Sequence, residues 1–218
     1  MMERMDVTIV GGHGQIALLL ARRLSEAGHR VRSTIRKPEH AVDVIAAGAE
    51  PVGVDLEDPV SDLDAAVRGA DAVVFAAGAG PGSGPQRKRD VDLGGAVRLI
   101  GAAREAGVRR YVMVSATGTE RATVAGAMGP YLEAKLQADE ALADSGLDFT
   151  IVRPGRLTDD PATGLVACAA HFGRSGEVAR DDVAAVLHAV LELPQTIGHT
   201  FEVMDGDTPI ERAVATLA

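Results

Sequence analysis

A glycine-rich turn stands near the start of the chain, between a short apolar segment and a segment of helical period, in the stretch VTIVGGHGQIALLLARRL. The segment Val7 to Val10 is β-branched and apolar, which predicts a buried strand. After the turn, apolar residues recur at the spacing of one helix face, at Ile16, Leu19, Leu20 and Leu24. A strand that passes through a tight turn directly into a helix is the opening unit of a parallel α/β sheet.

Further strand-like segments alternate with helical or loop segments along the chain. They lie at Arg30 to Ile35, Glu50 to Gly53, Ala72 to Phe75, Tyr111 to Val114 and Phe149 to Val152. The alternation predicts an α/β fold, a Rossmann-like doubly wound parallel sheet with helices on both faces. In the tail, FEVM is expected to form one more strand. A helix should follow it, opening with a capping box at Thr208, Pro209, Ile210 and Glu211.

Length and composition exclude several classes of protein. With 218 residues, 46% of them hydrophobic, we expect one domain over residues 1–218 with a proper core. The net charge of −9 and the 3% of aromatic residues argue against nucleic acid and anionic membrane as partners. A single cysteine, Cys168, and scattered histidines predict no disulfide and no metal site. The N-terminus lacks a signal-peptide pattern, so we expect a soluble, cytoplasmic protein.

The glycine turn itself indicates a phosphate site. Gly11 permits the tight turn, Gly14 lets a pyrophosphate approach the backbone, and Ala17 is small enough for close helix packing. The phosphates of a dinucleotide would lie on the amides at the helix N-terminus. The alternative is a tight turn between strand and helix that binds no ligand.

Two cations follow the second predicted strand. An NAD-binding protein would place Asp or Glu there for the ribose 2′-hydroxyl, whereas this chain has Arg36 and Lys37, which suit a 2′-phosphate. NADP(H) is therefore the expected cofactor, unless both cations are solvated loop residues. Asp55 and the segment 76–78 (Ala76, Ala77 and Gly78) follow the next two strands and should line the adenine and ribose.

A tyrosine and a lysine stand four residues apart in a predicted helix. Tyr131 and Lys135 would share one helix face, and the nearby ammonium should lower the pKa of the phenol from about 10. Such a tyrosine can donate or accept a proton near neutral pH. Ser115, at the end of the preceding strand, could polarise a carbonyl oxygen. Outside a dinucleotide-binding fold, a tyrosine and a lysine at this spacing would be interpreted as an ordinary surface pair.

Together these motifs resemble the short-chain dehydrogenase/reductase superfamily. GGHGQIA, VDLGGAVRLIGAAREAGVRRYVMVSA, YLEAK, LDFTIVRPGRL and ARDDVA look most like its atypical NAD(P)-binding branch, which resembles epimerases and dehydratases, over nearly the whole chain. The resemblance implies cofactor contacts in the phosphate turn, at the 2′-phosphate, at the adenine and near the nicotinamide. They fall at Gly11, Gly12, His13, Gly14, Gln15, Ile16, Arg36, Asp55, Leu56 and Pro154. It also implies that Tyr131 is the acid/base, that Lys135 holds the nicotinamide ribose, and that Ser115 orients the substrate.

The chain departs from the family pattern in three places. It contains no asparagine, so the asparagine of the family's active-site tetrad is missing, and Asp92 either stands near that place or caps its helix. Ser115 lies 16 residues before Tyr131, somewhat farther than is usual, so Thr117 or Thr119 could serve instead. The last glycine of the phosphate turn is replaced by Ala17.

For the other polar residues, structural or solvent-exposed roles are expected more than catalytic ones. Arg180 and Asp182 resemble a structural motif of the branch, and His171 is expected to be an ordinary loop residue. The run Arg87 to Arg89 could meet an anionic substrate or the cofactor phosphates, although a solvated charge run is the commoner meaning.

The sequence leaves three functional hypotheses. The first is an NADP-dependent oxidoreductase acting on a small carbonyl, alcohol or quinone-like substrate, with segments 116–130 and 155–180 as lids, the latter a small C-terminal substrate-lid region. The second is an epimerase- or dehydratase-like enzyme, although only 64 residues follow Pro154, too few for the C-terminal domain of the long sugar-nucleotide relatives. The third is a non-catalytic NADP(H) sensor. Whether the protein is a monomer or a homo-oligomer is open.

Overall fold

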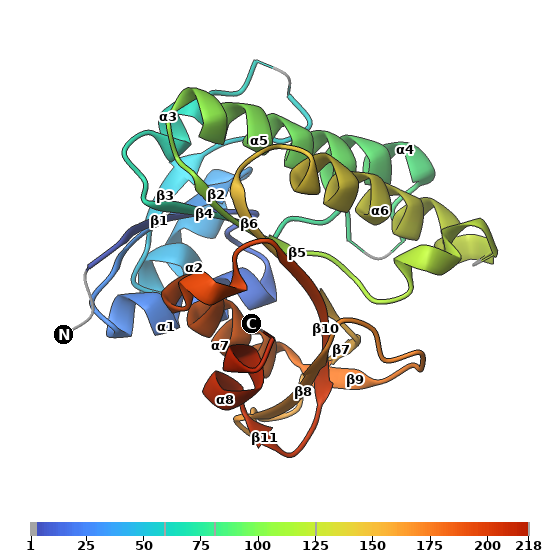
Figure 1. The fold of residues 1–218 in the computed structure, drawn as a ribbon. Helices are drawn as coiled ribbons and strands as arrows, with labels where there is room; N and C mark the ends of the chain where they lie inside the picture. The colour runs from blue at the N-terminus through green and yellow to red at the C-terminus, as the bar shows by residue number, and fades with distance from the viewer. Residues whose placement is uncertain (1–3, 59, 81, 125, 218) are drawn as a thin grey trace.

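A twisted sheet of nine strands runs through the centre of the molecule (Figure 1). The computed structural model describes residues 4–58, 60–80, 82–124 and 126–217. Seven strands are parallel in the order β3-β2-β1-β4-β5-β6-β10. Their bounds are β1 Asp6–Val10, β2 Arg30–Ile35, β3 Glu50–Gly53, β4 Ala72–Phe75, β5 Arg110–Val114, β6 Asp148–Pro154 and β10 His199–Asp205. This order confirms the predicted Rossmann-like sheet, with its reversal point between β1 and β4.

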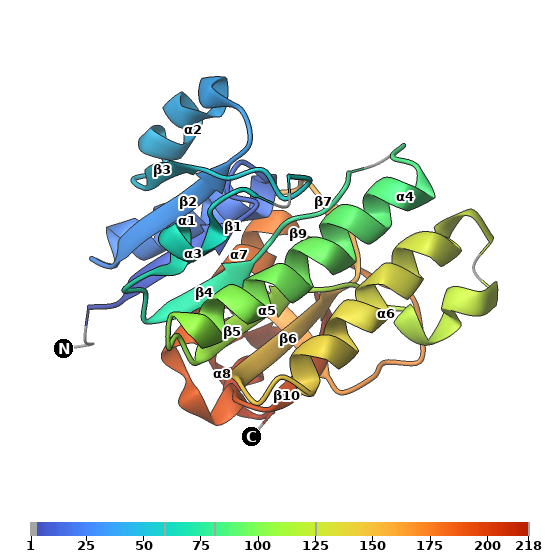
Figure 2. The same ribbon diagram turned by 90° about the horizontal axis from the view of Figure 1, so that it is seen from above.

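Helices cover both faces of the sheet (Figure 2). One layer holds α1 Gln15–Glu26, α2 Ala41–Ala46, α7 Arg180–Glu192 and α8 Ile210–Ala215; the other holds α3 Leu63–Val67, α5 Gly95–Glu105 and α6 Gly129–Ala143. The short α4, Pro85–Lys88, runs through a π-helical segment, Arg89–Gly94, into α5. Short 3-10 helices lie at Pro38–His40, Thr119–Val124, Gly126–Met128 and Pro194–Thr196.

Two apolar cores result from the alternation of side chains along the central strands. In β4, Ala72 and Val74 pack into the core under α1 and α7, whereas Val73 and Phe75 pack into the core under α5 and α6. All four are buried, as a parallel strand with helices on both faces should be. The sheet therefore holds the carboxyl ends of its parallel strands along one rigid edge.

The C-terminal part of the sheet contains elements that the sequence did not predict. Strand β8, Leu165–Ala169, lies inside the segment 155–180 and pairs antiparallel with β10, and β11, Thr208–Pro209, pairs with β8. A separate two-stranded sheet joins β7, Arg156–Thr158, to β9, Glu177–Ala179.

The predicted capping box at residues 208–211 is wrong. Thr208 pairs with Val166 in the sheet, and its hydroxyl donates to the side chain of Asp207. The N-cap of α8 is Pro209, so the helix begins only at Ile210.

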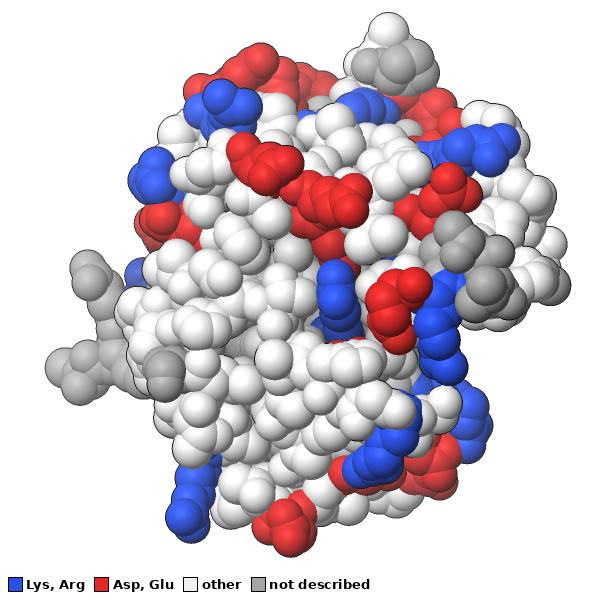
Figure 3. All heavy atoms as spheres, turned by 45° about the vertical axis from the view of Figure 1, so that its right-hand side comes forward, with Lys and Arg blue, Asp and Glu red and all other residues white. Residues whose placement is uncertain are grey.

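Charged side chains of both signs are mixed on the surface. On the face shown in Figure 3, Lys and Arg side chains alternate with Asp and Glu and form no continuous basic surface. Among the residues that the structure describes, no helix combines the length and the apolar character needed to cross a bilayer.

Candidate functional site

A cleft of about 250 Å³ opens at the carboxyl ends of β1 to β4, where the strand order reverses. Ligands of doubly wound sheets bind at this point. The lining consists of Gly11, His13, Gly14, Thr34, Ile35, Arg36, His40, Val54, Asp55, Leu56, Glu57, Ala76, Ala77, Gly78, Arg87 and Val91. The structure thus brings together nine of the residues that the sequence singled out for a cofactor, namely Gly11, His13, Gly14, Arg36, Asp55, Leu56, Ala76, Ala77 and Gly78.

The glycines of the turn differ in what requires them. Gly11 has a φ of +85°, and a Cβ there would stand 2.5 Å from the Cα of Ala77. A Cβ on Gly12 would stand 2.5 Å from the Cβ of Ser33, so the packing of the turn excludes side chains at both positions. Gly14 is the N-cap of α1, with an ordinary φ of −64°, and offers no side chain to its first-turn amides. Those amides, at Gln15 and Ile16, stay available to a phosphate.

The charged rim of the cleft contains one of the two predicted cations. Arg36 lines the cleft, and its Nη1 lies 2.5 Å from Oε2 of Glu57. Lys37 is exposed, lies 3.7 Å from Glu39, and is absent from the lining.

Two histidines that lie 27 residues apart in the chain stack at the mouth of the cleft. The ring centroids of His13 and His40 are 3.6 Å apart, and Nε2 of His13 lies 2.8 Å from Asp43 Oδ2. The lining residues that were not predicted come from several elements: Thr34 and Ile35 end β2, Val54 and Glu57 follow β3, His40 ends a 3-10 helix, Arg87 lies in α4 and Val91 in the π-helical segment. Only Arg87 among them had a sequence signal, as part of a basic run.

A buried ion pair lies beside the cleft. Lys135 Nζ stands 3.3 Å from Asp92 Oδ1 and donates to the carbonyl oxygens of Val114, at 3.2 Å, and Ala77, at 3.4 Å. Asp92 is fully buried in the π-helical segment, and its Oδ2 accepts from the backbone N–H of Ala79. The π-helical segment thus brings Asp92 to the lysine, and such segments are frequent at functional sites. Asp92 is no helix cap.

Ser115 belongs to a second buried group. Its hydroxyl donates to Asp139 Oδ2 at 2.9 Å, and Arg153 Nε donates to the same oxygen at 2.9 Å. Burial raises the pKa of Asp139 above its ordinary value, and the charge of Arg153 opposes that shift. In this arrangement the single proton of the Ser115 hydroxyl is directed to Asp139.

Tyr131 stands at the start of α6, one turn before Lys135 and two turns before Asp139. Burial raises its pKa above the ordinary value of 10, Lys135 lowers it, and Asp92 and Asp139 raise it further. The expectation that Lys135 lowers the pKa overall is therefore wrong, because burial outweighs the cation. The phenol is protonated at neutral pH.

Backbone hydrogen bonds join the segment after β5, which carries Ser115 and Thr117, to the end of β6, which carries Pro154. The N–H of Ser115 donates to the carbonyl of Val152, and that of Thr117 donates to the carbonyl of Pro154, at 3.1 Å. Thr119 is buried, whereas Pro154 closes β6 beside β10. Ala125, within the segment 116–130, lies outside the described residues.

The weaker candidates take structural roles. Asp182 is buried and accepts the backbone N–H groups of Thr163 and Gly164. His171 lies 3.0 Å from Glu202. Burial raises the pKa of the Cys168 thiol to about 12, which keeps it protonated.

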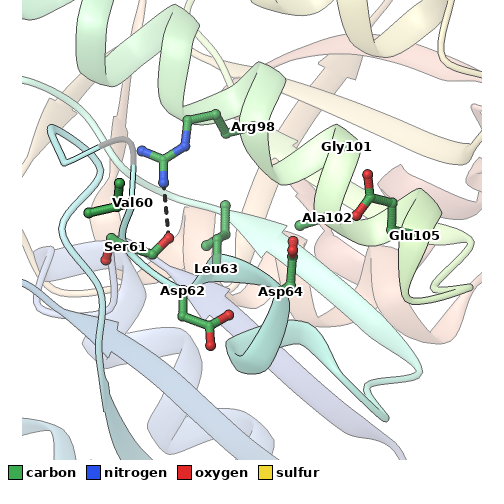
Figure 4. A pocket seen from close by; sticks show the side chains of 9 residues that line it. All are labelled: Val60, Ser61, Asp62, Leu63, Asp64, Arg98, Gly101, Ala102 and Glu105. Carbon is green, nitrogen blue, oxygen red and sulfur yellow. Dashed lines mark hydrogen bonds between the residues drawn. The ribbon is translucent and has the colours of Figure 1, made fainter.

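A second and larger cavity, of about 460 Å³, lies behind the loop that follows β3 (Figure 4). Its walls carry Asp62, Asp64 and Glu105, and Arg98 donates across it to the carbonyl of Ser61. None of the candidate cofactor or catalytic residues lines it.

Among the described residues, His29, His188 and Glu192 bring metal-ligating atoms within 4.8 Å of one another. Nδ1 of His29 accepts the backbone N–H of Met5 at 3.1 Å, so the neutral ring carries its proton on Nε2. A metal would have to displace that proton. Glu120, His171 and Glu202 form a second such group, in which Nδ1 of His171 already pairs with Glu202.

This chain is similar to other proteins over nearly its whole length. Residues 11–194 match the family model described as NAD(P)H-binding. A relative from Bacillus subtilis, "Uncharacterized sugar epimerase YhfK", is 40% identical over 215 residues, 98% of this chain and 100% of the relative. A candidate NAD-dependent epimerase/dehydratase from Bacillus halodurans matches in structure with a TM-score of 0.93 and 39% identity, over 98% of this chain and 100% of its own. The oxidoreductase ylbE from Lactococcus lactis matches in structure with a TM-score of 0.84 and 29% identity, over 98% of this chain and 96% of its own.

Proposed function

This chain belongs to the NAD(P)H-binding family, and from that premise we propose that it is an NADP-dependent oxidoreductase. Its substrate would be a small carbonyl, alcohol or quinone-like compound. The proposal rests on one observation, the contact between the cleft and the tyrosine-lysine helix. Ala77 lines the cleft, and its carbonyl oxygen accepts from Lys135, which stands one helical turn from Tyr131.

The cleft suits a dinucleotide by its chemistry. The bare N-cap at Gly14 offers backbone N–H groups to a pyrophosphate, and Arg36 offers a guanidinium to a 2′-phosphate. A ligand held at these two places would extend along the strand ends, past Ala77, toward Tyr131. Pro154 would border its far end.

The cofactor, when bound, supplies the hydride, and the protein supplies position and a proton. Tyr131 is protonated at neutral pH and would donate its phenolic proton to the substrate oxygen during reduction. Lys135, held by Asp92 and two carbonyl oxygens, would donate to the nicotinamide ribose. With its own proton directed to Asp139, Ser115 would accept from the hydroxyl of an alcohol substrate. To donate to a carbonyl oxygen, it would have to give up its hydrogen bond to Asp139.

The segments 116–130 and 155–180 would cover the substrate. The first contacts α6 through its 3-10 turns, on the helix that carries Tyr131. The second contributes β7, β8 and β9, and β8 joins the main sheet. Movement in the second segment would therefore be confined to the connections between these strands.

We expect NADPH to bind at least tenfold more tightly than NADH. One charge-assisted contact from Arg36 to the 2′-phosphate contributes about 1.5 to 3 kcal/mol, and about 1.4 kcal/mol corresponds to a factor of ten. Arg36→Ala should remove most of the preference and leave NADH affinity unchanged, as measured by titration calorimetry. Lys37→Ala is the matched control, because Lys37 is adjacent but outside the cleft lining. Equal affinities of the unmodified protein for the two cofactors would refute the NADP assignment.

Two other functions would produce different results in one assay. An epimerase- or dehydratase-like enzyme, in keeping with the descriptions of its relatives, returns the hydride to its own substrate and consumes no NADPH. A sensor binds NADPH and turns over nothing, a role that the aspartate at position 92 would permit. Consumption of NADPH with a panel of carbonyls and quinones supports the oxidoreductase against both.

A further inference from the structure

Glu57 lies between two arginines that come from different parts of the fold. Its Oε2 is 2.5 Å from Nη1 of Arg36, in the loop after β2. Nη2 of Arg87, on α4, lies 3.2 Å from the same oxygen, and Nε of Arg87 lies 3.2 Å from Oε1. All three residues line the cleft. We call them the Arg36–Glu57–Arg87 triad.

The loop that carries Glu57 is held in place from behind. The N–H of Glu57 donates to Asp55 Oδ1, and the N–H of Asp55 donates to Ser61 Oγ, both at 2.9 Å. Arg98, on α5, donates to the carbonyls of Leu56 and Ser61, the second bond being visible in Figure 4. These hydrogen bonds fix the backbone position of Glu57, and the side chains of the two arginines extend to its carboxylate.

The triad is accessible and carries an excess of positive charge. The side chains of Arg36 and Arg87 are 41% and 40% exposed, and that of Glu57 is 34% exposed. Exposed ion pairs of this kind contribute little to stability, so their partners can be exchanged. Two guanidiniums around one carboxylate match the planar, bidentate recognition of phosphate.

We propose that Arg36 and Arg87 together form the seat of the cofactor 2′-phosphate, and that Glu57 is an internal counter-ion which the phosphate displaces. This inference rests on the proposed function, in which an NADP cofactor occupies the cleft. Arg87 becomes a specificity-determining residue, although it follows a different strand from Arg36. Glu57 opposes NADPH binding, because its carboxylate competes with the phosphate for the same donors.

The opposing interpretation is that the triad is a latch that closes α4 onto the loop after β3. The two interpretations predict opposite signs for Glu57→Gln. A competing anion, once removed, should leave NADPH bound about three- to tenfold more tightly. A latch, once broken, should leave both cofactors bound more weakly.

The experiment is a titration of NADPH and NADH into four variants of the full chain. Arg87→Ala should weaken NADPH binding by about three- to tenfold and leave NADH within about twofold. Arg89→Ala is the matched control, because Arg89 lies two residues away and donates to Gln86 instead of Glu57. Arg36→Ala reports on the proposed function, and Glu57→Gln decides between counter-ion and latch.

The outcomes separate the two proposals. Loss of the NADPH preference in Arg36→Ala but not in Arg87→Ala would overturn the two-arginine seat and leave the NADP assignment standing. Weaker NADPH binding by Glu57→Gln would overturn its role as a competing ion. Equal binding of NADPH and NADH by the unmodified protein and by every variant would overturn the NADP assignment together with this inference.

Discussion

Replacement of Tyr131 by phenylalanine is expected to lower carbonyl turnover by about a hundredfold to ten-thousandfold, the usual contribution of general acid catalysis. The variant loses the phenolic proton and keeps the ring, and NADPH affinity should barely change. Steady-state kinetics beside a cofactor titration measure both effects. Tyr111→Phe is the matched control, because Tyr111 is fully buried and donates to the carbonyl of Ala96, away from the cleft. Full activity in Tyr131→Phe would contradict this role of Tyr131 and favour direct hydride transfer to an acceptor that needs no tyrosine.

The pH profile gives an independent test of the same residue. Burial raises the pKa of Tyr131 above 10, so the acid form persists through neutral and moderately alkaline pH. Reduction by NADPH needs the protonated phenol. Its rate should therefore show no Tyr131-dependent fall as the pH is raised from neutral toward 10. Alcohol oxidation, which needs the phenolate, should accelerate as pH rises. A tyrosine-dependent decline of reduction near pH 7 would contradict this assignment.

Lys135→Ala should weaken both turnover and cofactor binding. It also leaves Asp92 fully buried without its cation, and a broken buried pair costs about 3 to 5 kcal/mol of stability. The double variant Asp92→Asn with Lys135→Met removes both charges and provides the folded comparison. Its melting temperature should exceed that of Lys135→Ala while its turnover stays low.

Gly14→Val is expected to abolish cofactor binding while the fold remains largely intact. Gly14 has backbone angles that valine accepts, and the nearest atom to an added Cβ is the carbonyl oxygen of Gly11, 3.2 Å away. The branched side chain would occupy the place where a pyrophosphate approaches the amides of α1. Titration with NADPH and a circular dichroism spectrum measure the two effects.

Gly101→Val serves as the control for that variant. Gly101 lies in α5, and a Cβ there has nothing within 4 Å. This variant should bind NADPH normally. Normal binding by Gly14→Val would place the phosphates elsewhere.

Short-range spacing determined the fold and the outline of the site. The strand, glycine turn and helix at residues 7–24 form a unit whose members lie within a few residues of one another, so their pattern can be read directly. The alternation of strands and helices then predicts a doubly wound sheet, because parallel strands need crossovers that are almost always right-handed. The same pattern predicts that Gly14, Arg36, Asp55 and Ala77 lie at one sheet edge, and all four line the cleft.

Long-range pairing decided what local patterns could not. The residues Thr208 to Glu211 carry a capping-box pattern, yet β8 supplies a neighbouring strand and Thr208 pairs with Val166, so the helix begins later. The hydroxyl of Ser115 is turned to Asp139, which lies 24 residues onward. Neither partner is marked by a motif in the sequence.

The direction of pKa shifts and the pairing of charges depended on the tertiary structure more than any other property of the site. The spacing of Tyr131 and Lys135 determined that they share a helix face, but the direction of the tyrosine pKa depends on burial and on Asp92 and Asp139. Likewise, Glu57 joins Arg36, 21 residues away, to Arg87, 30 residues away, only because the loops after β2 and β3 meet α4 at one edge of the sheet. Sequence spacing determines which residues share an element, whereas charge interactions depend on distances and solvent exposure that exist only after the elements have packed.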